Sequence, residues 1–446
     1  MNFRKFSNLF IVQSIVFALL LVNALRPDTI PDILILVSAM VMPLFLSAAE
    51  IPAYIIGFAT MGTGVQVAYI ALSCLIFMVF KTRGRLHTLS LISILVFIIY
   101  ELIHMIFFKT DEIIEFIRYV AVYALLFISM FTKSDNNDKK RIVDSYIYGN
   151  IISIVHVFLE TLAFFKGDVT NFFSGNFRLG YAEKLGAELT MSADPNLLGQ
   201  GCSFTIVLGL TMLLLGYIQK RYFISMGFCL IAGAFTLSKT FLLSLALIVL
   251  LVLLFAGSWN SIKVLKMRIL IIAVTLIGGI ALISIYPDYL KNIWDRFILN
   301  ELTTGRLNSA SIYFDALLSS VIDCFFGLGL QNVGEKIGFT GSPHAAIIEV
   351  WACFGIVGML ALIILIIKSI SFNMSDIKAK AINFIPLIVF TILVQSTQLF
   401  RLRDRVFILL VMIAVTGIST RRIKTNETKE KGSGRFKFGS YPRRRS

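Results

Sequence analysis

Long apolar blocks separated by short polar connectors run along most of this chain. The blocks Leu9–Leu25, Leu89–Phe108, Leu242–Phe255 and Ile382–Leu399 are nearly free of charged residues. Blocks of roughly 17–25 apolar residues are long enough to cross a bilayer as single helices. The pattern therefore predicts an all-α, polytopic membrane protein.

The number of spans depends on the Gly/Thr-broken stretch that starts at Ile51, whose first part, Ile51–Thr60, could cross, re-enter or join a neighbour. Placing both the basic connector Lys81–Arg85 and the basic C-terminal tail in the cytoplasm requires an even count, so we expect about twelve spans, within a range of about twelve to fourteen. The expected spans besides that stretch are Leu9–Leu25, Ile30–Ser47, Leu86–Phe108, Ile113–Phe131, Val143–Phe165, Leu197–Ile218, Tyr222–Leu237, Thr240–Phe255, Ile269–Tyr286, Ala345–Ile367, Ile382–Leu399 and Val406–Ile418.

In this topology two connectors on the outer side are long, residues 166–196 and 287–343. Within the second, apolar positions from Ser309 to Phe326 fall on one helical face, and Gly327-Leu-Gly329 follows. We expect an interfacial helix that ends at these glycines. The predicted organisation is one transmembrane domain, residues 1–420, with a working face made by two outer loops, followed by a disordered cytoplasmic tail, residues 421–446.

Composition agrees with this interpretation and narrows the function. The 446 residues are 57% hydrophobic and 15% charged, which is too apolar for a water-soluble enzyme. Of the net charge of +15, the tail supplies +8, from ten Lys/Arg and two Glu. A polybasic segment beside a span favours anionic lipid headgroups and the cytoplasmic side. No motif indicates nucleic-acid binding.

Metal and disulfide signals are lacking in the sequence. The five cysteines are scattered through apolar blocks, without CxxC or Cys/His metal spacing. Neither an HExxH motif, a P-loop nor a DxD-like pair is present. The apolar N-terminal run lacks a clean small-residue cleavage site, so we interpret it as the first span with its N-terminus inside.

Charged groups at the outer edge of spans are functional candidates because a charge near the bilayer is costly. Arg306 lies within the second loop and His344 directly follows it, and the histidine could accept a proton near neutral pH. Arg178 lies among aromatic residues of the first loop, a setting suited to a phosphate or sugar. Asp194 is a second catalytic candidate, although Asp before Pro-Asn equally fits a helix N-cap.

Further cations are predicted at the same face. Lys239 lies at a hairpin between two spans, where it could instead snorkel to the interface. Arg118 is near the outer end of a span, and Glu115, three residues earlier, could simply pair with it. Arg401 and Arg403 lie outside against the positive-inside trend. We interpret the pairs Glu101/His104 and His156/Glu160, at helical spacing, as structural.

Several of these pieces, in this order between spans, resemble the O-antigen polymerase and O-antigen ligase superfamily of bacterial envelope glycosyltransferases. The resemblance covers roughly Phe165 to Gly358 and the overall layout. The matching pieces are Arg178, Asp194-Pro195-Asn196-Leu-Leu-Gly199, Leu237-Ser238-Lys239-Thr240, Gly305-Arg306, Gly327-Leu-Gly329 and Pro343-His344 before Gly355-Ile-Val-Gly358. Lys239 stands where the family usually presents arginine, and Ala345 follows His344 where it usually has a polar residue.

The resemblance implies a GT-C-like, metal-independent, inverting glycosyltransferase without a cofactor in the bacterial inner membrane. It implies a polymerase that transfers an undecaprenyl-diphosphate-linked glycan onto a new lipid-linked repeat unit at the periplasmic face, assisted by membrane lipids and a chain-length regulator. In this hypothesis His344 or Asp194 acts on the acceptor hydroxyl. The diphosphate and glycan would be bound by Arg178, Arg306, Lys239, Arg118, Arg401 and Arg403. An O-antigen ligase and a polysaccharide flippase are the alternatives.

Overall fold

The structure is a computed structural model of the chain. It describes residues 8–27, 29–61, 66–108, 112–168, 178–184, 187–190, 194–255, 306–331, 333–339, 346–373 and 406–419, with isolated helical positions between 269 and 284. In these ranges the chain is dominated by helices, and six are long and apolar enough to span a membrane. The prediction of a helical membrane protein is confirmed at this level.

The six long helices match predicted spans closely. They are α1 (Asn8–Leu25), α5 (Thr88–Phe108), α6 (Ile113–Met130), α7 (Asn136–Phe164), α8 (Pro195–Leu214) and α16 (Ala346–Asn373). Shorter apolar helices are α2 (Asp32–Val41) with the 3-10 turn η1 (Met42–Phe45), α4 (Val67–Lys81), α9 (Lys220–Phe235), α10 (Lys239–Phe255) and α18 (Ile408–Gly417). The predicted span Ile382–Leu399 lies outside the described ranges, as does most of Ile269–Tyr286.

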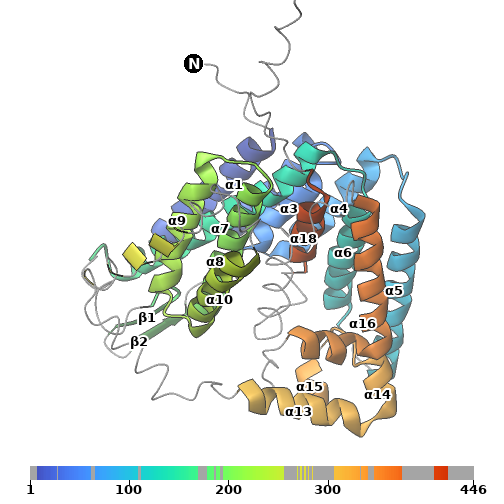
Figure 1. Ribbon diagram of the computed structural model, residues 1–446. Helices are drawn as coiled ribbons and strands as arrows, with labels where there is room; N and C mark the ends of the chain where they lie inside the picture. The colour runs from blue at the N-terminus through green and yellow to red at the C-terminus, as the bar shows by residue number, and fades with distance from the viewer. Residues whose placement is uncertain are drawn as a thin grey trace, which may run out of the picture.

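The helix α7 is central, since it packs against α1, α3, α8, α9 and α18 (Figure 1). One of these partners, α3 (Ile51–Ala59), is only nine residues long, about 13 Å, or less than half a bilayer. All nine residues of α3 are buried. The broken helix is thus covered by protein on every side, as irregular backbone at membrane depth requires.

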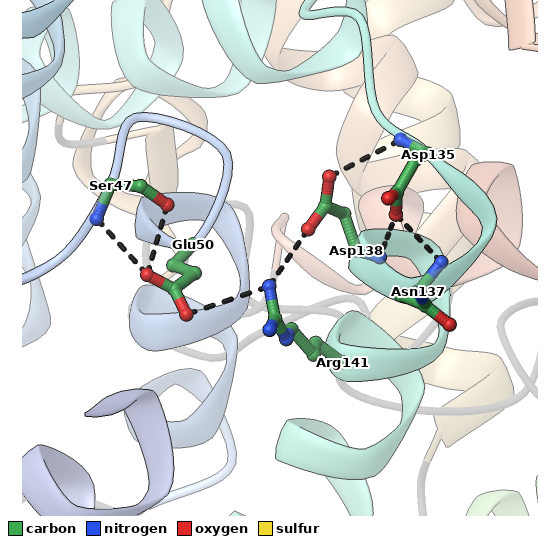
Figure 2. A network of polar contacts seen from close by, with 6 residues as sticks. All are labelled: Ser47, Glu50, Asp135, Asn137, Asp138 and Arg141. Atoms are coloured by element: carbon green, nitrogen blue, oxygen red, sulfur yellow. Dashed lines mark hydrogen bonds and ion pairs between the residues drawn. The ribbon is translucent and has the colours of Figure 1, made fainter. Parts of the chain in front are cut away.

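Polar side chains join the helix ends at the basic side of the bundle. Arg141 on α7 pairs with Asp138 Oδ1 at 3.0 Å and with Glu50 Oε1 at 3.5 Å, while Glu50 accepts from the backbone of Ser47 (Figure 2). Asp135 forms a capping box at the start of α7. The same end holds Lys81, which donates to carbonyls of the η1 region. Both α3 and α4 therefore have one end here.

At the opposite end of the helices lie the described parts of the two long connectors (Figure 1). Strands β1 (Tyr181–Lys184) and β2 (Ala187–Thr190) form an antiparallel hairpin with Tyr181 opposite Thr190. Helices α13 (Arg306–Ser319), α14 (Val321–Phe326) and α15 (Val333–Ile337) come from the second connector. Both connectors thus reach the same end of the bundle, and that this end faces outward stays a prediction.

Two details differ from the sequence-based prediction. The β1–β2 hairpin adds a small two-stranded sheet to a fold predicted as all-α. Its signal in the sequence was a pair of four-residue runs, Tyr181–Lys184 and Ala187–Thr190, separated by two residues. The single interfacial helix expected from Ser309 to Phe326 is two helices, because Ser320 is extended and its side chain accepts from Asp323 N as the N-cap of α14. The expected stop at Gly327, with φ of 73°, is confirmed.

Candidate functional site

The N-terminal end of α8 is capped by Asp194. Its backbone is extended, and its side chain accepts a hydrogen bond from the Asn196 amide at 2.6 Å, with Pro195 in the first helical turn. This is the geometry of an N-cap, in which a short acidic side chain satisfies an otherwise unpaired amide of the first turn. The capping interpretation of Asp194 is therefore confirmed.

The first turn of α8, next to the cap, contacts the turn between α9 and α10. Ser238 Oγ donates to Asn196 Oδ1 at 3.2 Å and accepts from Phe241 N at 3.4 Å. A Cβ built on Gly199 would lie 2.9 Å from Ser238 Cβ, so only glycine lets α8 approach this turn so closely. Two motifs that are about forty residues apart in sequence are thereby joined in space.

Arg178 is held against the same turn. Its Nε donates to the Thr236 carbonyl at 3.2 Å, and the neighbouring Leu179 N donates to the Phe235 carbonyl at 3.0 Å. Lys239 begins α10 one residue after Ser238 and is half-buried. We call the set Arg178, Asp194, Asn196, Ser238 and Lys239 the hairpin corner. It gathers two cations, drawn from separate segments, at the N-terminal ends of α8 and α10 and the C-terminal end of α9.

Arg118 has a different role. Its guanidinium pairs with Glu115 and donates to Tyr69 OH at 2.6 Å, with the Tyr69 ring centre 4.8 Å away. The pairing with Glu115 that the sequence allowed is confirmed, and the hydrogen bond to Tyr69 ties α6 to α4. His156 likewise faces Glu160, at 3.6 Å between Nδ1 and Oε1.

A second polar cluster, missed by the sequence analysis, lies where α5 meets α14 and α16. Gly355, with φ of 62° and ψ of −176°, breaks α16 and leaves preceding carbonyls without helical donors. The turn after α14 supplies them: Leu328 N donates to Ala352 O at 2.7 Å and Gly329 N to Cys353 O at 2.9 Å. The kink and the turn are therefore one unit.

Three side chains of α5 hold this unit. Tyr100 OH donates to the Phe354 carbonyl at 2.6 Å and also contacts the Phe326 carbonyl. Glu101 Oε2 accepts from Leu330 N at 3.2 Å, and His104 Nε2 lies 3.2 Å from the Gly327 carbonyl. Glu101 and His104 thus have the structural role expected from the sequence. The segment that they hold, the Gly-rich turn after α14, was not expected.

Two residues from the second connector complete this cluster. Gln331 follows Leu330 and is 2% exposed. Lys336 donates to the Leu328 carbonyl at 2.6 Å and lies 4.3 Å from the Phe108 ring centre. Burial lowers the pKa of Lys336, an effect that the nearby Glu101 carboxylate partly opposes. We call Glu101, His104, Gln331 and Lys336 the turn corner. The features of the sequence that could have indicated this cluster were a Glu and a His, Glu101 and His104, inside an apolar block.

The remaining predicted site residues are placed only in part. Arg306 is the first residue of α13. His344, Arg401 and Arg403 lie outside the described residues. Within the part of the chain that the structure describes, no group of three His, Cys, Asp or Glu side chains is arranged to hold a metal ion.

An apolar cavity of about 320 Å³ lies between α5, α6 and α16. It is lined almost wholly by aliphatic and aromatic side chains, with Tyr100 connecting it to the turn corner; the lining includes Ile92, Val96, Phe97, Phe354 and Leu365. The outward side of α5 is also apolar and exposed, as expected for a helix that faces lipid. The cavity suits an alkyl or isoprenoid chain rather than a polar ligand.

Comparison with known proteins yields no match: no family model fits the chain, and neither a curated protein nor a solved structure is similar to it.

Proposed function

We propose that this protein is an O-antigen-type surface-polysaccharide polymerase of the bacterial inner membrane, with about twelve spans and a GT-C-like architecture. It would transfer a glycan from undecaprenyl diphosphate onto a new lipid-linked repeat unit at the periplasmic face. The observation that supports this most is the hairpin corner, where Arg178 and Ser238-Lys239 meet at the outer end of the helices. The apolar cavity beside α5 supports a lipid-linked substrate.

The chemistry follows from these groups. The acceptor hydroxyl attacks the anomeric carbon of the donor, the bond from that carbon to the diphosphate oxygen breaks, and the diphosphate leaves with the electron pair. Arg178 and Lys239 would neutralise the charge that develops on the diphosphate. His344 is our proposed acceptor of the hydroxyl proton, and Arg306 a further phosphate ligand. Arg118 is paired within the bundle, so we assign it a structural role.

Deleting the gene from a smooth strain tests the function. Loss of a polymerase should leave lipid A–core capped by one repeat unit. Bare core with accumulated lipid-linked polymer would instead identify a ligase, and bare core with little polymer a flippase. Normal long chains in the deletion strain would exclude all three.

Complementation with variants of Arg178 tests the site. Arg178→Ala should reduce polymer synthesis about 10²-fold, the usual cost of one electrostatic group that acts on the transition state. Arg178→Lys should recover part of this, since lysine keeps the charge but not the planar fork. The matched control is Arg85→Ala, an exposed arginine in the α4–α5 connector at the other end of the bundle. Full activity of Arg178→Ala, with equal amounts in the membrane, contradicts the site.

A further inference from the structure

The turn corner contains buried polar atoms that have no partner. Glu101 is 1% exposed and Gln331 is 2% exposed. Among the described residues, Glu101 Oε1 and both polar atoms of the Gln331 side chain, Oε1 and Nε2, lack a hydrogen bond. A buried polar group without a partner costs about 1–3 kcal/mol, so such groups call for an explanation.

The surrounding groups of the turn corner do have partners, so the arrangement is not loose packing. Glu101 Oε2 accepts from Leu330 N, which fixes the carboxylate beside Gln331 in the chain. His104 uses both ring nitrogens, toward the Tyr100 and Gly327 carbonyls. Because Glu101 is hydrogen-bonded to the turn that carries Gln331, and Tyr100 and His104 of the same helix also hold this turn, the open hydrogen-bonding atoms are held in place for a ligand.

The chemistry of the open atoms selects the ligand class. Two oxygens accept hydrogen bonds and one amide donates, so the ligand must both donate and accept. A hydroxyl group does both. A phosphate or other anion would meet the Glu101 carboxylate, and the cation of the turn corner, Lys336, already donates to the Leu328 carbonyl and interacts with that carboxylate, so an anion is unfavourable. No third acidic, His or Cys ligand completes a metal site in the described parts of the chain.

We propose that Glu101 and Gln331 form a saccharide subsite, in which Glu101 Oε1 and the Gln331 amide bind hydroxyl groups of the glycan. This proposal rests on the proposed polymerase function. The turn corner and the hairpin corner lie on opposite flanks of the helix bundle (Figure 1). The subsite therefore binds sugars that are distant from the reacting bond, and it holds the glycan between successive transfers.

Lys336 is the cationic side chain of the turn corner. It lies over Phe108 and donates to the Leu328 carbonyl, next to the turn. Lysine has a long, flexible side chain, and this one is only half-buried, so its ammonium group can turn outward when a hydroxyl group enters.

The test uses the full-length protein in lipid nanodiscs. Thermal unfolding is measured with and without a probe, the oligosaccharide released by mild acid from the surface polysaccharide of the same strain. Ligand that binds only the folded state raises the melting temperature. The variants are Gln331→Leu and Glu101→Gln, with the exposed Glu335→Gln on α15 as matched control.

We expect the wild type and Glu335→Gln to be stabilised by the probe, and both test variants to bind it about tenfold more weakly or worse. Without probe, Gln331→Leu should melt at the same or a higher temperature, because an apolar side chain removes the unpaired amide. In cells, both variants should make short chains but still complete a first transfer.

Three outcomes overturn the subsite. They are no response of the wild type to the probe, unchanged affinity in both variants, and a lower melting temperature of Gln331→Leu with unchanged affinity. If one variant fails to fold, the affinity of the other decides. The deletion phenotype separates this result from the proposed function: single-repeat capping together with unchanged probe binding in both variants rejects the subsite alone, whereas long chains in the deletion strain reject the polymerase.

Discussion

The two corners of the bundle are built in different ways. In the hairpin corner, side chains bind one another and nearby carbonyls, and two cations are brought together: Asp194 caps α8, Ser238 binds Asn196, and Arg178 binds Thr236. In the turn corner, backbone groups bind backbone groups across the Gly355 kink, and the buried side chains Glu101 and Gln331 keep atoms without partners.

Because of this difference, the two corners suit two chemically different parts of one substrate. A cationic corner suits a diphosphate, whereas a corner with a carboxylate and an amide suits hydroxyl groups. Several helices separate the carboxylate of the turn corner from the cationic corner (Figure 1).

The largest effect expected on this comparison comes from Gly355→Ala. A Cβ at this position would lie 2.3 Å from the Phe325 carbonyl oxygen, and the backbone there is in a region that only glycine adopts readily. We expect a loss of about 3 kcal/mol or more of folding stability and collapse of the turn corner. Fluorescence of Trp351, which donates to the Cys324 carbonyl, and thermal unfolding report the change.

The control for this substitution is Gly227→Ala in α9, where a Cβ meets nothing within 4 Å. It should be neutral or stabilise by up to about 1 kcal/mol, since alanine is the better helix former. Equal stability of the two variants would show that the kink is not the organising feature of the turn corner.

A smaller effect is expected at Asp194, and it distinguishes capping from catalysis in the hairpin corner. Asp194→Asn should keep wild-type stability and polymer synthesis, because asparagine is an equally good N-cap. Asp194→Ala should cost about 1 kcal/mol of stability. Polymer analysis of the two variants checks this: an inactive but stable Asp194→Asn protein would make the carboxylate itself chemically necessary.

The smallest effect is the pH dependence contributed by Lys336. Its pKa in the folded protein is below the ordinary 10.5, chiefly because burial disfavours the ammonium form. Between the lowered pKa and 10.5 the unfolded chain binds more protons, so stability contributed at this position should rise with pH in that window. Lys336→Met should flatten this slope in unfolding experiments from neutral to alkaline pH; an unchanged slope would assign it to other groups.

The membrane-spanning character and the positions of most helices could be predicted, because apolar length is a local property. Asp194 is an example of a prediction from neighbouring residues alone: the sequence Asp-Pro-Asn indicated a helix N-cap, and the structure has one. The pairing of Arg118 with Glu115 was equally local, at a spacing of three residues on one helix.

The turn corner could not be predicted in the same way. Glu101 and Leu330 are 229 residues apart, and nothing in either segment specifies its partner. The break between α13 and α14 at Ser320 could not be predicted, because the apolar pattern of the segment continues on both sides of this residue. Only the packing of α14 against α16 distinguishes two helices from one.

By itself the sequence determined that this chain crosses a membrane, which of its ends are basic and where caps and glycine stops occur, because hydrophobic length, charge and backbone preference act over a few residues. Only the tertiary structure decided which outer segments meet and which buried polar atoms are left without partners. Those properties depend on how helices that are distant in sequence pack, and a hydrogen bond is satisfied or left open only once its neighbours are in place.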